Sequence, residues 1–241
     1  MQRNKLVVCL GASIVRGMFG AGFVKILERR MARDGFEFRN FGIGGDLSFN
    51  VLARVDPVIA LLPDYIIILV GTNDVTAALY PGLSRISARV LKRGPGCNFT
   101  AESYQKNMLS IVKMLKQRTQ AEIAIASLPV VGEDVSSTVN ERVRQYNALL
   151  KEIAAQENAG YLPVHERQEE CLQAAVNGRG RAFRPADMLM FKLILKHYIM
   201  RRSYDDISRD NGFLLLTDGI HMNGRGAAII ADLAEEFLRY N

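Results

Sequence analysis

The segment DYIIILVG, residues 64–71, is the strongest predicted strand of this chain. It is a continuous apolar run rich in β-branched residues, and such runs are typical of strands buried on both faces of a parallel sheet. A second run of the same kind, KLVVCLG, lies upstream at Lys5–Gly11. We therefore predict a central strand at Asp64–Gly71 and the first strand of the same sheet at Lys5–Gly11.

In the rest of the chain, predicted strands and helices alternate. Further strands are predicted at Phe36–Gly42, at Ala121–Pro129 and, as a short fifth strand, at YLPV in residues 161–164. Helices are predicted at Phe19–Arg33, at Phe49–Leu62, from a Thr100 cap to about Thr119, from Ser136 or Ser137 to about Asn158, and at Asn223–Tyr240. Because crossovers between parallel strands are right-handed, this alternation predicts a flavodoxin-like α/β fold. It has three layers, α/β/α, around a five-stranded parallel sheet of order 2-1-3-4-5.

One segment, at about residues 166–211, breaks this alternation. Within it, ADMLMFKLILKHYIMRRS at Ala186–Ser203 is the most apolar stretch of the chain. Such a helix requires cover on several sides. A helix packed on the domain, a lid over an acyl pocket, a membrane-surface helix and a dimer contact all fit this pattern. We expect a single domain over residues 1–241 with an insert at 166–211, and the sequence leaves the oligomeric state open.

Composition excludes several classes of protein. Of the 241 residues 49% are hydrophobic and 23% are charged, which excludes disorder for the bulk of the chain. The net charge is +6, but the chain has no Trp and no interleaving of aromatic and basic residues, so we expect no nucleic-acid partner. The spacing of the three cysteines resembles no zinc site, and reduced thiols are expected. With neither a signal-peptide core nor a run of about 18 apolar residues, the sequence predicts a cytoplasmic protein without a transmembrane segment.

Residues that follow the predicted strands are candidates for chemistry, because ligands of open parallel sheets bind beyond the carboxyl ends of the strands. Ser13 follows the first strand, Asn40–Asp46 the second and Gly71–Asp74 the third. Asp218 and His221 lie near the C-terminus. Each of these residues also has an ordinary interpretation as a helix cap or a turn residue.

Together these residues meet the requirements of nucleophilic catalysis. A serine hydroxyl such as that of Ser13 needs an adjacent base, and His221 can serve. The imidazolium that forms needs a carboxylate, and Asp218 lies three residues before His221. An oxyanion needs donors, which the backbone N–H groups of Ser13 and Gly45 and the side-chain amide of Asn73 can supply.

This constellation resembles the SGNH hydrolases, also called the GDSL esterase/lipase family. GAS at Gly11–Ser13, NFGIGG at Asn40–Gly45, GTND at Gly71–Asp74 and DGIH at Asp218–His221 stand in the order of the family's four blocks. The sequence departs from the pattern at Ala12, where the family usually has Asp, and in the long insert before DGIH.

The resemblance implies a serine esterase or lipase-like hydrolase that cleaves carboxylic esters through an acyl-serine intermediate. It implies Ser13, Asp218 and His221 as the triad, Ser13, Gly45 and Asn73 as oxyanion donors, and no metal or organic cofactor. The expected partner is a small-molecule ester, with an acyl-chain or lipid-like substrate suggested by the apolar insert. A sugar O-acetyl esterase, an acyltransferase of the same fold and a non-catalytic SGNH-like binding protein are the alternatives.

The remaining candidates for chemistry are weaker. His165 is expected to be a solvated or hydrogen-bonded loop residue and His197 to be structural. Cys9 lies inside a predicted strand, and neither Cys97 nor Cys171 has a recognisable partner. The glycines of Gly17–Gly22 have the spacing G-x-x-G-x-G, which is not that of a dinucleotide-binding loop.

Overall fold

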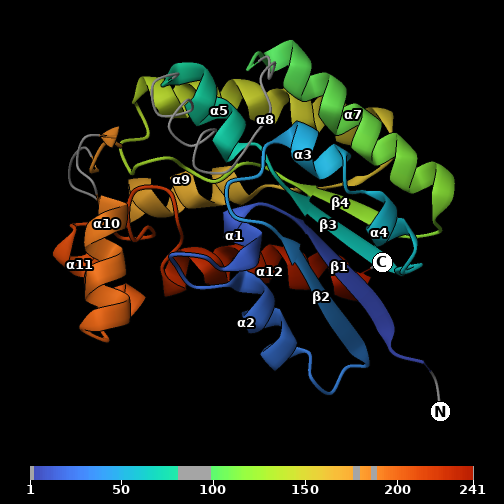
Figure 1. Cartoon of the computed structure of the whole chain (residues 1–241), viewed down its shortest axis with the longest axis horizontal. Helices are drawn as coiled ribbons and strands as arrows, with labels where there is room; N and C mark the ends of the chain where they lie inside the picture. The colour runs from blue at the N-terminus through green and yellow to red at the C-terminus, as the bar shows by residue number, and fades with distance from the viewer. Residues whose placement is uncertain (1–2, 81–98, 176–179, 186–188, 241) are drawn as a thin grey trace.

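The computed structural model describes residues 3–80, 99–175, 180–185 and 189–240. Its centre is a five-stranded sheet of order β2-β1-β3-β4-β5 in which every neighbouring pair is parallel (Figure 1). The predicted fold class and strand order are both confirmed. The strands are β1 (Lys5–Gly11), β2 (Phe36–Gly42), β3 (Tyr65–Leu69), β4 (Glu122–Ala126) and β5 (Gly160–Leu162).

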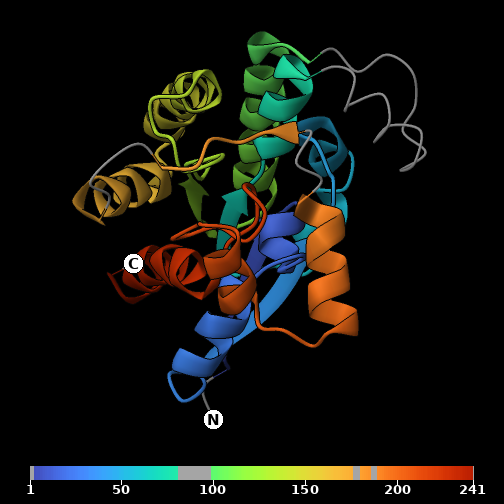
Figure 2. The same cartoon turned by 90° about the vertical axis from the view of Figure 1, so that its left-hand side faces the viewer.

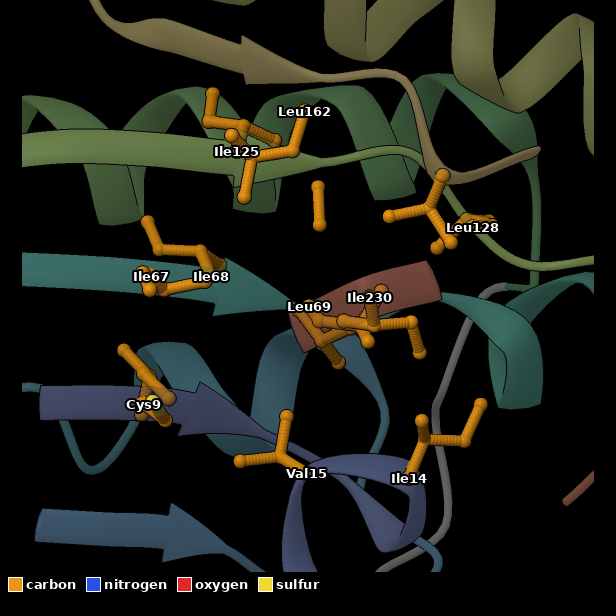
Figure 3. Packing of buried hydrophobic residues seen from close by; sticks show 14 of the residues in the cluster. Cys9, Ile14, Val15, Ile67, Ile68, Leu69, Ile125, Leu128, Leu162 and Ile230 are labelled. Atoms are coloured by element: carbon orange, nitrogen blue, oxygen red, sulfur yellow. The ribbon is translucent and has the colours of Figure 1, made fainter. Parts of the chain in front are cut away.

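The central position of β3 follows from its composition. All five of its residues are buried, and β1 and β4 flank it. Figure 3 shows Ile67 and Ile68 of β3 lying between Cys9 of β1 and Ile125 of β4 within the same apolar cluster. A strand covered on both edges and both faces gains nothing from polar side chains, which explains its uninterrupted apolar run.

Helices cover both faces of the sheet (Figures 1 and 2). One layer holds α1, α2, α9 and α12, and the other holds α3, α5, α7 and α8, with α4 following α3. The bounds are α1 (Ser13–Arg16), α2 (Phe23–Arg30), α3 (Ser48–Leu52), α4 (Asp56–Ile59), α5 (Thr72–Leu79), α7 (Ala101–Arg118), α8 (Thr138–Gln156), α9 (Val164–Ala175) and α12 (Gly224–Tyr240).

Two helix predictions were wrong in extent. The helix expected at Phe19–Arg33 spans only Phe23–Arg30, and it cannot begin at Phe19, because that residue has a left-handed backbone with φ 59°. The helix expected at Phe49–Leu62 is divided into α3 and α4. Pro57 accounts for the division, since it has no N–H to continue a helix but fits the first turn of a new one.

The structure adds a helix after β3 that the sequence did not predict. This helix, α5, begins at Thr72, directly after the strand. The two predicted caps agree better with the structure. Thr100 caps α7 by accepting from the N–H of Ser103, and Ser137, rather than Ser136, caps α8 by accepting from the N–H of Asn140.

The predicted insert is largely helical. It contains most of α9, then α10 (Leu189–Ile194), the π-helical turn η2 (Leu195–Ile199) and α11 (Tyr204–Asp210), while residues 186–188 of the predicted apolar helix lie outside the described part. In Figures 1 and 2, α10 and α11 stand at the end of the sheet where β1 leads into α1. Among the helices described, none is long and apolar enough to cross a membrane. The organisation of residues 1–241 as one domain stays a prediction.

Candidate active site

Ser13, His221 and Asp218 form a continuous chain of hydrogen-bonded side chains. Ser13 opens α1 immediately beyond the carboxyl end of β1, and its Oγ lies 3.0 Å from Nε2 of His221. The other ring nitrogen of His221, Nδ1, lies 2.8 Å from Oδ2 of Asp218. All three residues are more than nine-tenths buried. The structure therefore brings together three residues that the sequence separates by as many as 208 positions.

A tight turn presents Asp218 and His221 to Ser13. Oδ1 of Asp218 accepts the backbone N–H groups of Ile220 and His221, at 3.0 and 2.9 Å, while Oδ2 remains for the imidazole. Burial raises the pKa of Asp218, but the His221 ring and the two backbone N–H groups lower it by more, so its net pKa lies below the ordinary value. Asp218 is thus held as a carboxylate that accepts from Nδ1–H and leaves Nε2 of His221 free to accept a proton.

Phe19 packs against this turn, a contact that the sequence did not reveal. Its ring meets that of His221 edge-on, with centroids 5.3 Å apart. Its carbonyl oxygen accepts from Oγ1 of Thr217 at 2.8 Å, which places the left-handed Phe19 backbone next to the DGIH turn. Left-handed conformations are costly for an aromatic residue and occur where the surrounding structure imposes them.

Of the two predicted oxyanion donors outside Ser13, Asn73 is hydrogen-bonded to the residue that follows Gly45. Nδ2 of Asn73, in the first turn of α5, donates to the carbonyl oxygen of Asp46 at 2.8 Å. Because a side-chain amide has two N–H bonds, a second donor remains on Asn73. Gly45 has φ 78°, a conformation that favours glycine. Among the residues described, the backbone N–H groups of Ser13 and Gly45 have no protein acceptor.

A close contact joins the Gly45 loop to the Ser13 loop. A Cβ atom on Gly42, at the end of β2, would lie 2.2 Å from the backbone nitrogen of Arg16 and 2.8 Å from the carbonyl oxygen of Ala12. Glycine is therefore required at this position. The neighbouring N–H of Ile43 donates to the carbonyl oxygen of Gly11 at 3.1 Å. The two loops are thus fixed to each other through backbone.

Arg54, between α3 and α4, holds the same two loops and was not singled out from the sequence. Its guanidinium donates to Oδ2 of Asp46 at 2.8 Å, to the carbonyl oxygen of Phe41 at 2.9 Å and to that of Gly11 at 2.7 Å. The side chains of Arg54 and Asp46 are 19% and 11% exposed, so water screens this ion pair little. Nothing in its sequence neighbourhood marks Arg54, because its partners lie on other segments.

Replacing Arg54 by lysine is expected to lower kcat for ester hydrolysis about 10-fold. An ammonium group cannot make the fork of three bonds that a guanidinium makes, so the loops carrying Ser13 and Gly45 lose their common anchor. The measurement is kcat per active site, counted by titration with a fluorophosphonate. Arg29→Lys, at an exposed arginine of α2, is the matched control and should keep wild-type turnover. Equal turnover in both variants would contradict this role for Arg54.

The other two histidines lie away from this chain of hydrogen bonds. The prediction of a loop position for His165 was wrong: it lies in the first turn of α9, only 2% exposed, with Nε2 3.2 Å from Oε1 of Glu169. Burial lowers its pKa. His197 lies in η2, where Nδ1 is 2.8 Å from the carbonyl oxygen of Arg202 and the ring stacks on Tyr204, in agreement with a structural role.

The cysteines and possible metal ligands offer no competing site in the part of the chain that is described. Cys9 is buried in β1, and burial raises the pKa of its thiol, which keeps it protonated. Cys171 is half-buried, and Cys97 lies outside the described residues. No group of three or more His, Cys, Asp or Glu side chains within the described ranges could hold a metal ion.

Comparison with known proteins assigns the family. The model of the GDSL-like lipase/acylhydrolase family matches residues 9–229, which include Ser13, Gly45, Asn73, Asp218 and His221. The chain belongs to this family. This GDSL-family protein is thus a carboxylic ester hydrolase by class. No curated protein is a significant match for its sequence.

Solved structures resemble this GDSL-family protein over almost its whole length. Axe2, an acetylxylan esterase from Geobacillus stearothermophilus, is 18% identical with a TM-score of 0.69, over 99% of this chain and 96% of Axe2. LAE5, an alpha/beta hydrolase from the metagenome of Lake Arreo, Spain, is 17% identical with a TM-score of 0.66, over 98% and 95% of the two chains. At these identities the likeness establishes a common fold.

Proposed function

We propose that this GDSL-family chain hydrolyses carboxylic esters through an acyl-serine intermediate on Ser13. The observation that carries the proposal is the hydrogen-bonded chain from Asp218 through His221 to Ser13, with distances of 2.8 and 3.0 Å. A serine within 3.0 Å of an imidazole that is itself oriented by a buried carboxylate has what an activated nucleophile requires. The family match supports the same reaction class.

In the first half of the reaction, Oγ of Ser13 attacks the ester carbonyl carbon while its proton passes to Nε2 of His221. The tetrahedral intermediate then collapses, the bond to the alkoxy oxygen breaks, and His221 gives the proton to the departing alcohol. In the second half, water attacks the acyl carbon, and its proton passes through His221 to Oγ of Ser13 as the carboxylic acid leaves. Asp218 stays ionised throughout and stabilises the imidazolium.

The developing oxyanion is stabilised by three N–H donors. These are the backbone N–H groups of Ser13 and Gly45 and the second N–H of the Asn73 side chain. Support comes from the lack of protein acceptors for the two backbone donors within the described residues and from the bond between Asn73 and Asp46, next to Gly45. Donors fixed before the reaction stabilise the transition state without reorganisation, which makes them effective.

Two observations bear on the substrate. The exposed side chains Leu195, Ile199 and Met200, on η2 and directly after it, favour an acyl-chain or lipid-like ester, since such side chains can cover an apolar group. The activity of Axe2, an acetylxylan esterase of similar fold, favours a sugar O-acetyl ester instead. An acyltransferase would use the same residues and differ only in the alcohol that replaces water.

Hydrolysis of p-nitrophenyl esters from acetyl to palmitoyl tests the proposal. We expect turnover of at least one ester, stoichiometric labelling by a fluorophosphonate, and a labelled peptide that carries the modification on Ser13. The highest turnover with the acetyl ester would favour a sugar O-acetyl esterase. The highest turnover with a longer acyl chain would favour a lipase-like enzyme. Labelling on a residue other than Ser13, or a folded protein that neither turns over nor is labelled, would contradict the mechanism and favour a binding protein.

A further inference from the structure

A buried carboxylate outside the hydrogen-bonded triad holds the segment that leads to Asp218. Glu133 lies in the loop after β4 and is only 4% exposed. Its Oε2 accepts the backbone N–H of Leu214 at 2.7 Å, and its Oε1 accepts those of Leu215 and Leu216 at 2.6 and 3.0 Å. Three consecutive backbone donors therefore converge on one side chain that is more than 80 positions away in the sequence.

The segment that Glu133 binds runs directly into the catalytic turn. Leu216 is two residues before Asp218 and pairs with Met222 in an antiparallel bridge. The N–H of Thr217 donates to the carbonyl oxygen of His221 at 2.8 Å, which closes the turn. A displacement of Leu214–Leu216 would therefore be transmitted to both Asp218 and His221 through backbone.

The loop of Glu133 makes a second contact inside the turn itself. The N–H of Gly132 donates to the carbonyl oxygen of Gly219 at 2.7 Å, between Asp218 and His221. Gly132 has φ 66°, and a Cβ atom there would lie 2.3 Å from the backbone nitrogen of Phe183. Glu133 thus holds the segment that leads into the catalytic turn, and the adjacent Gly132 holds the middle of the turn.

A carboxylate suits this position better than any neutral side chain. Backbone N–H groups that have no partner in a helix or sheet need an acceptor when they are buried. A carboxylate is an acceptor at both oxygens, whereas a glutamine would turn an NH₂ group toward one of the three N–H donors. Burial raises the pKa of Glu133, and the three backbone N–H groups offset only part of that rise.

We propose that Glu133 is a positioning residue that fixes the Asp218–His221 turn at hydrogen-bonding distance from Ser13. The inference rests on the proposed function of Ser13, Asp218 and His221. Glu133 takes no part in proton transfer. Its contribution is to keep Nε2 of His221 near the 3.0 Å separation from Oγ of Ser13 that proton transfer requires.

Glu133→Gln is the decisive variant, because it is isosteric and loses one acceptor. We expect kcat per active site to fall about 100-fold with KM unchanged, since a misplacement of the base affects the chemical step rather than binding. Active sites are counted by fluorophosphonate titration, and folding is followed by circular dichroism. Proton NMR of the His221 Nδ1–H gives a readout independent of any substrate, and we expect that resonance to shift or broaden.

Asp134→Asn is the matched control. It removes one carboxylate from the adjacent residue, where, within the part of the chain that the structure describes, Oδ1 accepts from the N–H and hydroxyl of Ser136 alone. We expect this variant to keep wild-type kcat and the wild-type His221 resonance. A loss of turnover in Asp134→Asn equal to that in Glu133→Gln would assign the effect to the loop or its charge in general and overturn the specific role of Glu133.

Further outcomes separate positioning from plain stability. If Glu133→Gln melts earlier but keeps wild-type kcat per titrated site and an unchanged His221 resonance, the inference is overturned. If that variant does not accumulate as a folded protein, Glu133→Asp, which keeps the charge but has a shorter reach, is judged by the same two readouts. Ser13→Ala is measured alongside. Wild-type turnover in Ser13→Ala would refute the proposed function, whereas its loss together with an unaffected Glu133→Gln would refute the Glu133 inference alone.

Discussion

Replacing Ser13 by alanine is expected to lower kcat for ester hydrolysis by about 10⁵-fold or more. The variant lacks the oxygen that attacks the ester carbonyl, so no acyl-enzyme can form. The residual rate is that of unactivated water aided by the oxyanion donors alone. KM and the affinity of the protein for the reaction product should both change little, because the side chain lost is small and mainly takes part in the chemical step. Steady-state hydrolysis of the best p-nitrophenyl ester gives the result.

The matched control is Ser136→Ala, which removes a hydroxyl that donates to Asp134 in an exposed turn. It should keep wild-type turnover and fluorophosphonate labelling, while Ser13→Ala should lose both. A folded Ser13→Ala protein with more than a small fraction of the wild-type kcat would mean that another group is the nucleophile.

Replacing Asp218 by asparagine is expected to lower kcat by about 10⁴-fold. Asparagine can still accept the backbone N–H groups of Ile220 and His221 through Oδ1, so the turn is retained. Its Nδ2 would then donate to Nδ1 of His221 and force the proton of the neutral ring onto Nε2. An imidazole in that tautomer cannot accept the proton of Ser13, which removes the general base without removing the histidine. The measurement is kcat per folded protein, compared with Asp232→Asn at an exposed aspartate of α12, which should be unaffected.

The same variant also tests the electrostatics of Asp218. Its pKa is lower in the folded chain than its ordinary value, so the ionised carboxylate stabilises the fold at pH values above the ordinary aspartate range. That stabilisation is lost as the pH falls through this range toward the folded pKa. In thermal melts we expect Asp218→Asn to lose less stability than wild type on acidification. An identical acid dependence in both proteins would contradict a lowered pKa for Asp218.

Strands were more predictable from the sequence than helices, for a physical reason. The uninterrupted apolar run at Asp64–Gly71 is stable only as a strand of a sheet that is covered on both faces. Its composition alone was therefore enough to predict a buried central strand. The region around Phe49–Leu62 has helical spacing throughout, but Pro57 divides it. Phe19 could not have been excluded from its predicted helix by local pattern, because its contacts come from the other end of the chain. Its carbonyl oxygen accepts from Oγ1 of Thr217, and the N–H of the nearby Ala21 donates to the carbonyl oxygen of Met222.

Within the candidate site, the predicted residues were those carried by short motifs. Ser13, Asp218 and His221 each lie within two residues of a glycine, at the end of a strand or in a tight turn, and that local context can be recognised in one sequence. Arg54 and Glu133 could not be found in this way. Each is defined by partners on distant segments, and its own neighbourhood is that of an ordinary surface residue of a loop.

The 208-residue separation between Ser13 and His221 also affects how activity depends on folding. The nucleophile follows β1, whereas the base precedes the last helix, α12. Their hydrogen bond therefore closes a loop that contains all the remaining strands of the sheet, from β2 to β5. Contacts of such long range form late, because the entropy of closing the loop must be overcome first. The onset of ester turnover in a refolding chain therefore reports that the two ends of the chain have come together, which secondary-structure signals cannot do.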